Sequence, residues 1–68
     1  MQIHEAIRKL VDNEHLTEEQ AAAAMEAIMT GRATPAQIAG FLIALRMNGE
    51  TVSEIAGCAR TMRRHALA

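Results

Sequence analysis

The residues of this 68-residue chain that could do chemistry are three histidines, one cysteine and a group of arginines near the C-terminus. His4, His15 and His65 stand alone, since none lies three or four residues from another histidine or from Cys58, as two ligands on one helix would. We interpret them as surface histidines. Cys58 has no catalytic motif around it, which favours a small, inert, partly buried thiol. The sequence therefore predicts no catalytic, cofactor-binding or metal-binding residue.

The basic segment near the C-terminus contains Arg60, Arg63, Arg64 and His65. Cations in the last turns of a helix interact favourably with its dipole and hydrogen-bond its final carbonyls. The alternative is contact with phosphate or nucleic acid. Seven basic against eight acidic residues give a net charge of −1, without the strong positive field that such binding usually needs. We therefore favour the structural interpretation, and nucleic acid is not the expected partner.

The helices that must position these residues are marked by three capping boxes. A threonine stands three residues before a Gln or Glu in each: Thr17 with Gln20, Thr34 with Gln37 and Thr51 with Glu54. In this pattern the threonine oxygen accepts from a free amide of the first turn, and the Gln or Glu reaches back to the threonine amide. Pro35 suits the first helical position, where no hydrogen bond is lost. Gly31, Gly49 and Asn13 can end helices in the left-handed conformation.

These signals predict four short helices, near residues 2–12, 17–30, 34–48 and 51–66. Half of the residues are apolar, but Phe41 is the single aromatic residue, so Ala, Ile, Leu and Met must build the core. That composition favours helices and disfavours strands. A chain this short supports one core. We expect an all-α bundle of four helices, with residues 1–68 forming a single domain.

Three of the helices are expected to be amphipathic, each with one apolar stripe at helical spacing. The first stripe contains Ile3, Ile7, Leu10 and Val11. The second contains Ala21, Ala24, Met25, Ile28 and Met29. The stripe of the last helix contains Val52, Ile55, Ala56, Ala59 and Met62. We expect all three stripes to face the core.

The helix of residues 34–48 differs from the others because it has two apolar faces. One is bulky and contains Ile38, Phe41, Leu42 and Leu45. The other is flatter and contains Ala36, Ala39, Gly40, Ile43 and Met47. Three small neighbouring helices cannot easily cover both faces, and exposed apolar patches usually mark association sites. These nine residues are the candidate interface, and the sequence leaves open which face meets a partner.

The distribution of apolar residues and the single cysteine predict the cellular location. Charges at Glu5, Arg8 and Lys9 interrupt the N-terminal segment, unlike the apolar region of a signal peptide. The longest apolar run, residues 38–45, is far shorter than the roughly 20 residues of a membrane-spanning helix. One cysteine cannot form a disulfide within the chain. We therefore expect a cytoplasmic location and no membrane partner.

Residues 16–66 resemble the N-terminal helical domain of the anthranilate phosphoribosyltransferases, a helical-bundle domain of glycosyltransferase family 3. The most specific segments are IMTGRATPAQIAGFLIALRMNGET, residues 28–51, and EIAGCARTMR, residues 54–63. Pyrimidine nucleoside phosphorylases carry a similar domain, but ATPAQIAGFLIALR is more similar to the anthranilate enzymes.

The resemblance implies a part of an enzyme of tryptophan biosynthesis that transfers phosphoribosyl from phosphoribosyl diphosphate to anthranilate. In that family the diphosphate-binding loop, the magnesium ligands and the catalytic α/β domain follow this domain, so we expect this chain to lack them and to be inactive alone. The family also implies a homo-oligomer, a dimer, and packing against the catalytic domain. The alternative is an independent helical module that binds protein or nucleic acid through the basic end of its last helix.

Overall fold

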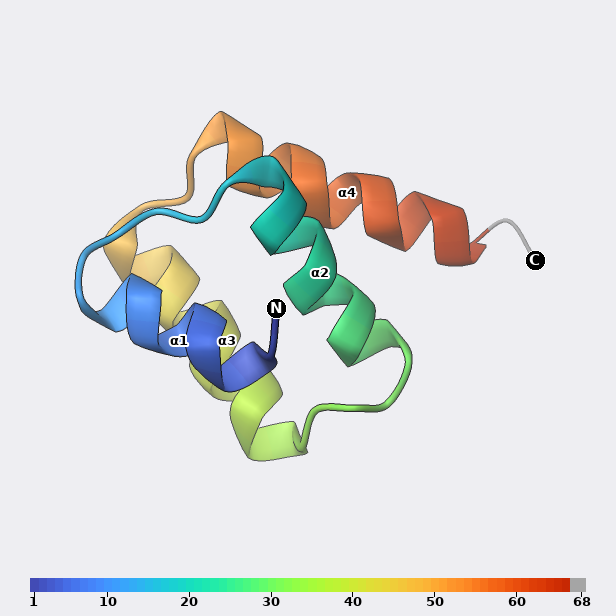
Figure 1. The fold of residues 1–68 in the computed structure, drawn as a ribbon, viewed down its shortest axis with the longest axis horizontal. Helices are drawn as coiled ribbons and strands as arrows, with labels where there is room; N and C mark the ends of the chain where they lie inside the picture. Colours follow the sequence, from blue (N-terminus) through green and yellow to red (C-terminus); the bar gives the residue numbers. More distant parts are fainter. Residues whose placement is uncertain (67–68) are drawn as a thin grey trace.

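The computed structural model describes residues 1–66, which form four helices joined by short loops (Figure 1). They are α1 (Ile3–Val11), α2 (Glu18–Met29), α3 (Pro35–Asn48) and α4 (Val52–Ala66). Every expected boundary lies within one residue of the observed one. Residues 1–66 contain no strand, and the predicted all-α class is confirmed.

All three predicted capping boxes are present at the starts of α2, α3 and α4. At α2 the amide of Gln20 donates to Thr17 Oγ1 at 3.1 Å, and the amide of Thr17 donates to Gln20 Oε1 at 3.0 Å. Thr34 and Gln37 form the same two bonds. At α4 the amide of Thr51 donates to Glu54 Oε1 at 2.8 Å, and the amide of Glu54 donates to Thr51 Oγ1 at 3.1 Å. Each box satisfies amides that a helix start leaves unpaired.

The three helix ends also have the expected backbone. Asn13, Gly31 and Gly49 have positive φ angles of 63°, 75° and 86°. Glycine adopts such angles without steric cost, and asparagine tolerates them better than most residues. The chain can therefore reverse within a few residues after α1, α2 and α3.

The four helices pack as two pairs, with α2 along α4 and α1 against α3 (Figure 1). A smaller contact joins α1 to α2. Phe41 is fully buried in the core. The buried residues around it come from α1, α2, α4 and the loop before α2, and include Ile3, Leu10, Leu16 and Met25. A single core therefore joins the two pairs.

The predicted core stripe of α4 is wrong. Val52, Ile55 and Met62 are 85%, 54% and 46% exposed, and Ala56 and Ala59 are only partly buried. The side of α4 that is buried carries smaller or polar residues: Glu54, Gly57, Cys58 and Thr61.

The cause is the close approach of α4 to α2. A Cβ atom on Gly57 would lie 2.3 Å from the carbonyl oxygen of Glu18 and 3.0 Å from the Cβ of Ala21. The hydroxyl of Thr61 donates to the carbonyl of Ala22 at 3.2 Å. Only small side chains fit between backbones this close, so the bulky residues of α4 point outward.

The ends of two other predicted stripes are exposed as well. Val11, at the end of α1, is 66% exposed, and Met29, at the end of α2, is 42% exposed. Both lie in a last turn, where the helix extends past its neighbours. The other stripe residues of α1 and α2 are buried or half-buried.

Candidate functional site

The side of α3 that points away from the core is the main candidate site. We define the α3 outer face as Ala36, Ala39, Leu42, Ile43 and Met47. All five residues are exposed, and Met47 is 83% exposed. Arg46 also lies on this side and pairs with Glu50 at 2.9 Å. The α3 outer face is therefore apolar, with one charge that already has a partner.

The structure separates the nine candidate interface residues into two groups. Phe41 is fully buried, Leu45 is half-buried against the core, and Ile38 is half-buried. Gly40 faces α1, because a Cβ on it would lie 3.7 Å from the side-chain tip of Ile7. The other five residues make up the α3 outer face. The bulky face thus mostly packs inward, and the flatter face mostly remains in solvent.

A shallow pocket of about 220 Å³ extends the apolar surface from α3 onto α1. Met47 and Val11 both line it, with Leu10 and Ala44 at its sides. Sequence reasoning placed Val11 in the core and so missed its part in this surface. The position of Val11 in the last turn of α1 was the available signal.

The basic residues of α4 are largely engaged with acidic residues of α2. Arg60 Nη1 donates to Glu18 Oε2 and to Glu19 Oε1, each at 3.0 Å. These contacts lower the pKa of Glu19 and raise that of Arg60, mainly through their hydrogen bond. Any phosphate bound at Arg60 would have to displace two carboxylates.

The last turn of α4 is held in a similar way. Arg64 hydrogen-bonds to Glu26, and His65 Nε2 lies 2.9 Å from Glu26 Oε1. The hydrogen bond with His65 is the largest of the effects that lower the pKa of Glu26. Arg63, in contrast, is exposed and has no acidic side chain within 4.0 Å among residues 1–66. The basic end is thus mainly a link between two helices.

Glu54 is a fully buried carboxylate and the least expected feature of the structure. Its Oε2 accepts from the amide of Leu16 at 2.7 Å, and its Oε1 accepts from the amide and hydroxyl of Thr51. Burial alone would raise the pKa of Glu54, but these hydrogen bonds outweigh burial and lower it. His15 Nδ1 lies 3.8 Å from the same carboxylate. Glu54 therefore anchors the loop before α2 to α4 as a charged acceptor.

The remaining candidates for chemistry have structural surroundings. Burial, followed by the charge of Glu54, raises the pKa of the buried Cys58 thiol, which disfavours the reactive thiolate form. Within residues 1–66 no three His, Cys, Asp or Glu side chains group as a metal site would require. The described helices are also too short or too polar to cross a membrane.

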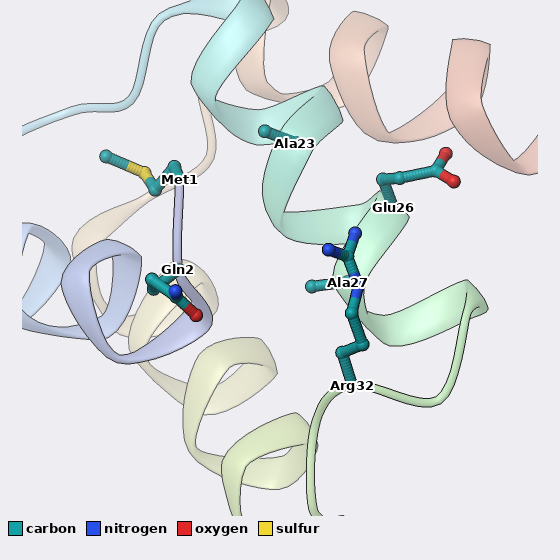
Figure 2. Close-up of a pocket in the computed structure, with 6 residues that line it drawn as sticks. All are labelled: Met1, Gln2, Ala23, Glu26, Ala27 and Arg32. Carbon is teal, nitrogen blue, oxygen red and sulfur yellow. The ribbon is translucent and has the colours of Figure 1, made fainter.

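A second pocket, of about 200 Å³, lies between the N-terminus, α2 and the loop after it (Figure 2). Glu26 and Arg32 are its charged lining residues. Glu26 already pairs with Arg64 and His65, and Arg32 Nε donates to Thr30 Oγ1 at 3.0 Å. Both charged residues of the lining are thus already engaged with other side chains.

Comparison with known proteins assigns this domain to a family. Residues 4–66 match the helical bundle domain of the glycosyl transferase family. The chain belongs to this family. The predicted resemblance to its helical domain is confirmed.

Individual relatives agree with this assignment. The chain is 61% identical over 61 residues to an anthranilate phosphoribosyltransferase of Moorella thermoacetica, and 58% identical over 67 residues to one of Roseiflexus castenholzii. These alignments cover 90% and 98% of this chain but 18% and 20% of the relatives. A third enzyme of the same name, from Symbiobacterium thermophilum, is 57% identical over 61 residues. The chain thus spans about a fifth of the length of these relatives.

Proposed function

We propose that this chain is the N-terminal association module of an anthranilate phosphoribosyltransferase and that it forms a homodimer through the α3 outer face. The observation that carries the proposal is the exposure of Leu42, Ile43 and Met47 on one side of α3, in a domain with a single small core. Soluble monomers seldom leave large apolar side chains together in water without a use for them.

The shape of the α3 outer face suits a twofold contact. Ala36 and Ala39 are small and exposed near the start of α3, so a second helix can come close to its backbone there. Ile43 and Met47 are bulky and lie towards its end. If two copies pair with opposite helix directions, the bulky half of each lies over the small half of the other. Such a self-complementary patch is what a twofold dimer needs.

The catalytic part of the proposal rests on the relatives. The parent enzyme would transfer phosphoribosyl from phosphoribosyl diphosphate to anthranilate, with magnesium. The residues of this chain do not fit a magnesium site, since residues 1–66 lack a cluster of acidic ligands. We therefore assign the diphosphate and magnesium sites to the catalytic domain of the parent, and we propose that this chain is inactive alone, packs on that domain and is cytoplasmic.

The dimer is tested by size-exclusion chromatography with light scattering at high micromolar concentration. We expect the unmodified chain to be a dimer, and both Ile43→Asn and Met47→Asn to shift it to the monomer. Val52→Asn is the matched control, because Val52 is as exposed as Met47 but lies on α4. A strictly monomeric unmodified chain, or equal loss of the dimer in the Val52 variant, would overturn the proposal.

The proposal that this chain is catalytically inactive alone is tested by a separate assay. Anthranilate is fluorescent, so its consumption by the chain with phosphoribosyl diphosphate and magnesium can be followed directly. We expect no consumption above the rate without protein. Enzymatic turnover would show that the assignment of the catalytic groups to the parent's other domain is wrong.

A further inference from the structure

We propose that the outward side of α4 is a second docking surface, which binds an amphipathic helix with acidic flanking residues. We define the α4 seam as Val52, Ile55, Ala59 and Met62. The surface lies on a different helix from the α3 outer face and is independent of the proposed dimer. Its four residues belong to the five-residue stripe of α4 that was expected from the sequence to face the core.

The spacing of the seam indicates the shape of its partner. Its residues follow one another at intervals of three, four and three. That is the spacing of the a and d positions of a heptad, which meet a second helix packed at a small angle. A surface of this period suits another helix better than a strand or an extended peptide.

The fold itself leaves the seam without a partner among the described helices. Gly57 and Thr61 contact α2, and they lie with the other buried residues of α4, Glu54 and Cys58, on another side of the helix. Amphipathic helices normally bury their large apolar residues and expose their charges. In α4 the order is reversed, since a carboxylate is buried and Val52, Ile55 and Met62 are in water. A second helix would cover these three residues without displacing α2.

The charge beside the seam indicates the chemistry of the partner. Arg63 follows Met62 and takes the e position of the heptad, which faces the flank of a bound helix. Arg60 and Arg64 pair with acidic residues of α2, but Arg63 lacks such a partner among residues 1–66. A bound helix with Asp or Glu at the flank that faces Arg63 would supply the missing acidic side chain.

A second copy of this chain does not provide that acidic flank. The residues in the e and g positions beside the seam are Thr51, Ala56, Cys58, Arg63 and His65. None of them is acidic. If two α4 seams paired, Arg63 would have no acidic partner, whether the two helices ran parallel or antiparallel. The seam therefore favours a different helix over self-association.

Two synthetic peptides, each added to the unmodified chain, test the proposal. Both are helical and carry leucines every 3.5 residues or so, but one has glutamates on its flanks and the other has lysines. Binding is followed by backbone amide chemical shifts, which report weak as well as tight binding. We expect the acidic peptide to shift the α4 amides in a saturable way. We also expect it to bind about two- to fivefold more tightly than the basic peptide, as one exposed ion pair allows.

Three variants sharpen the result. Ile55→Asn should abolish the α4 shifts, and Arg63→Glu should reverse the preference between the peptides. Both side chains are exposed, so the fold should tolerate the changes. Met47→Asn on α3 is the control and should bind the acidic peptide like the unmodified chain. The proposal is overturned if neither peptide shifts α4, if both bind equally, or if Ile55→Asn rather than Ile43→Asn removes self-association.

Discussion

The close approach of α4 to α2 at Gly57 gives a prediction for the substitution of this residue. A Cβ at this position would lie 2.3 Å from the carbonyl oxygen of Glu18, about 1 Å inside ordinary contact distance, and 3.0 Å from the amide of Ala22. These are backbone atoms, so α2 and α4 must separate to admit it. Such overpacking typically costs about 1–3 kcal/mol, and alanine recovers up to about 1 kcal/mol of helix propensity.

We therefore expect Gly57→Ala to lower the free energy of unfolding by up to about 2 kcal/mol, the balance of those two effects. That is a large share of the stability of so small a domain. The measurement is urea unfolding followed by far-ultraviolet circular dichroism at a fixed protein concentration, so that association does not contribute.

Gly40→Ala is the matched control for this experiment. Gly40 also lies inside a helix, but its Cβ would meet only the tip of Ile7, at 3.7 Å. The propensity gain is then not opposed by a clash, and we expect stabilisation of about 0.5–1 kcal/mol. If Gly57→Ala is as stable as Gly40→Ala, the close packing of α2 on α4 is not what selects the buried side of α4.

Three further predictions concern single residues. Glu54→Gln should cost about 1–3 kcal/mol, because a charged acceptor of buried hydrogen bonds is replaced by a neutral one. The folded state lowers the pKa of Glu54. The stability that Glu54 contributes is therefore fully present above its unfolded pKa, near 4.5, and is lost as the pH falls through its folded pKa. The free energy of unfolding of Glu54→Gln should then fall less steeply with acid than that of the unmodified chain, and an unchanged slope would contradict this. Thr34→Ala should cost about 1 kcal/mol in urea unfolding because it removes the cap of α3, whereas the exposed Ser53→Ala should have a smaller effect. Cys58 should react with a thiol reagent only as fast as the chain opens, since it is buried with a raised pKa; labelling at the rate of a free thiol would refute this.

The helix boundaries could be predicted because their causes are local. Each capping box joins residues three apart, such as Thr17 and Gln20, and Gly31 and Gly49 act on their own backbone. Such signals do not depend on what the helix later packs against. The four-helix, all-α fold follows from them.

The buried side of α4 could not be predicted, because distant contacts choose it. Glu54 is recognisable in the sequence as a capping residue, but its second role is to accept from the amide of Leu16, which is 38 residues away. That bond turns the carboxylate inward. Periodicity then misleads, since it assigns Val52, Ile55 and Met62 to a core that they do not enter. Glu54 and Gly57 decide the orientation of α4.

The two faces of α3 mark a different limit of sequence reasoning. Periodicity identifies both faces, but the residues of α3 alone do not say which one the rest of the chain covers. Phe41 decides this, because its large ring is fully buried in the core and Leu45, one turn further along α3, packs against the core with it. Ile43 and Met47 must then remain outside. The nine candidate interface residues thus combine exposed residues of α3 with residues that serve the core.

The exposed apolar surfaces connect the stability of this domain to its association. A chain of this size buries only about 60% of its extended surface, and here several large apolar side chains of α3 and α4, such as Met47 and Val52, are left exposed. Any partner that binds the folded state alone stabilises it by mass action. Covering the α3 outer face or the α4 seam would thus add to the stability that the small core cannot supply. If the proposed partners bind, Ile43 and Ile55, which are 59% and 54% exposed in the chain alone, would contribute more to stability in the complex than in the free domain.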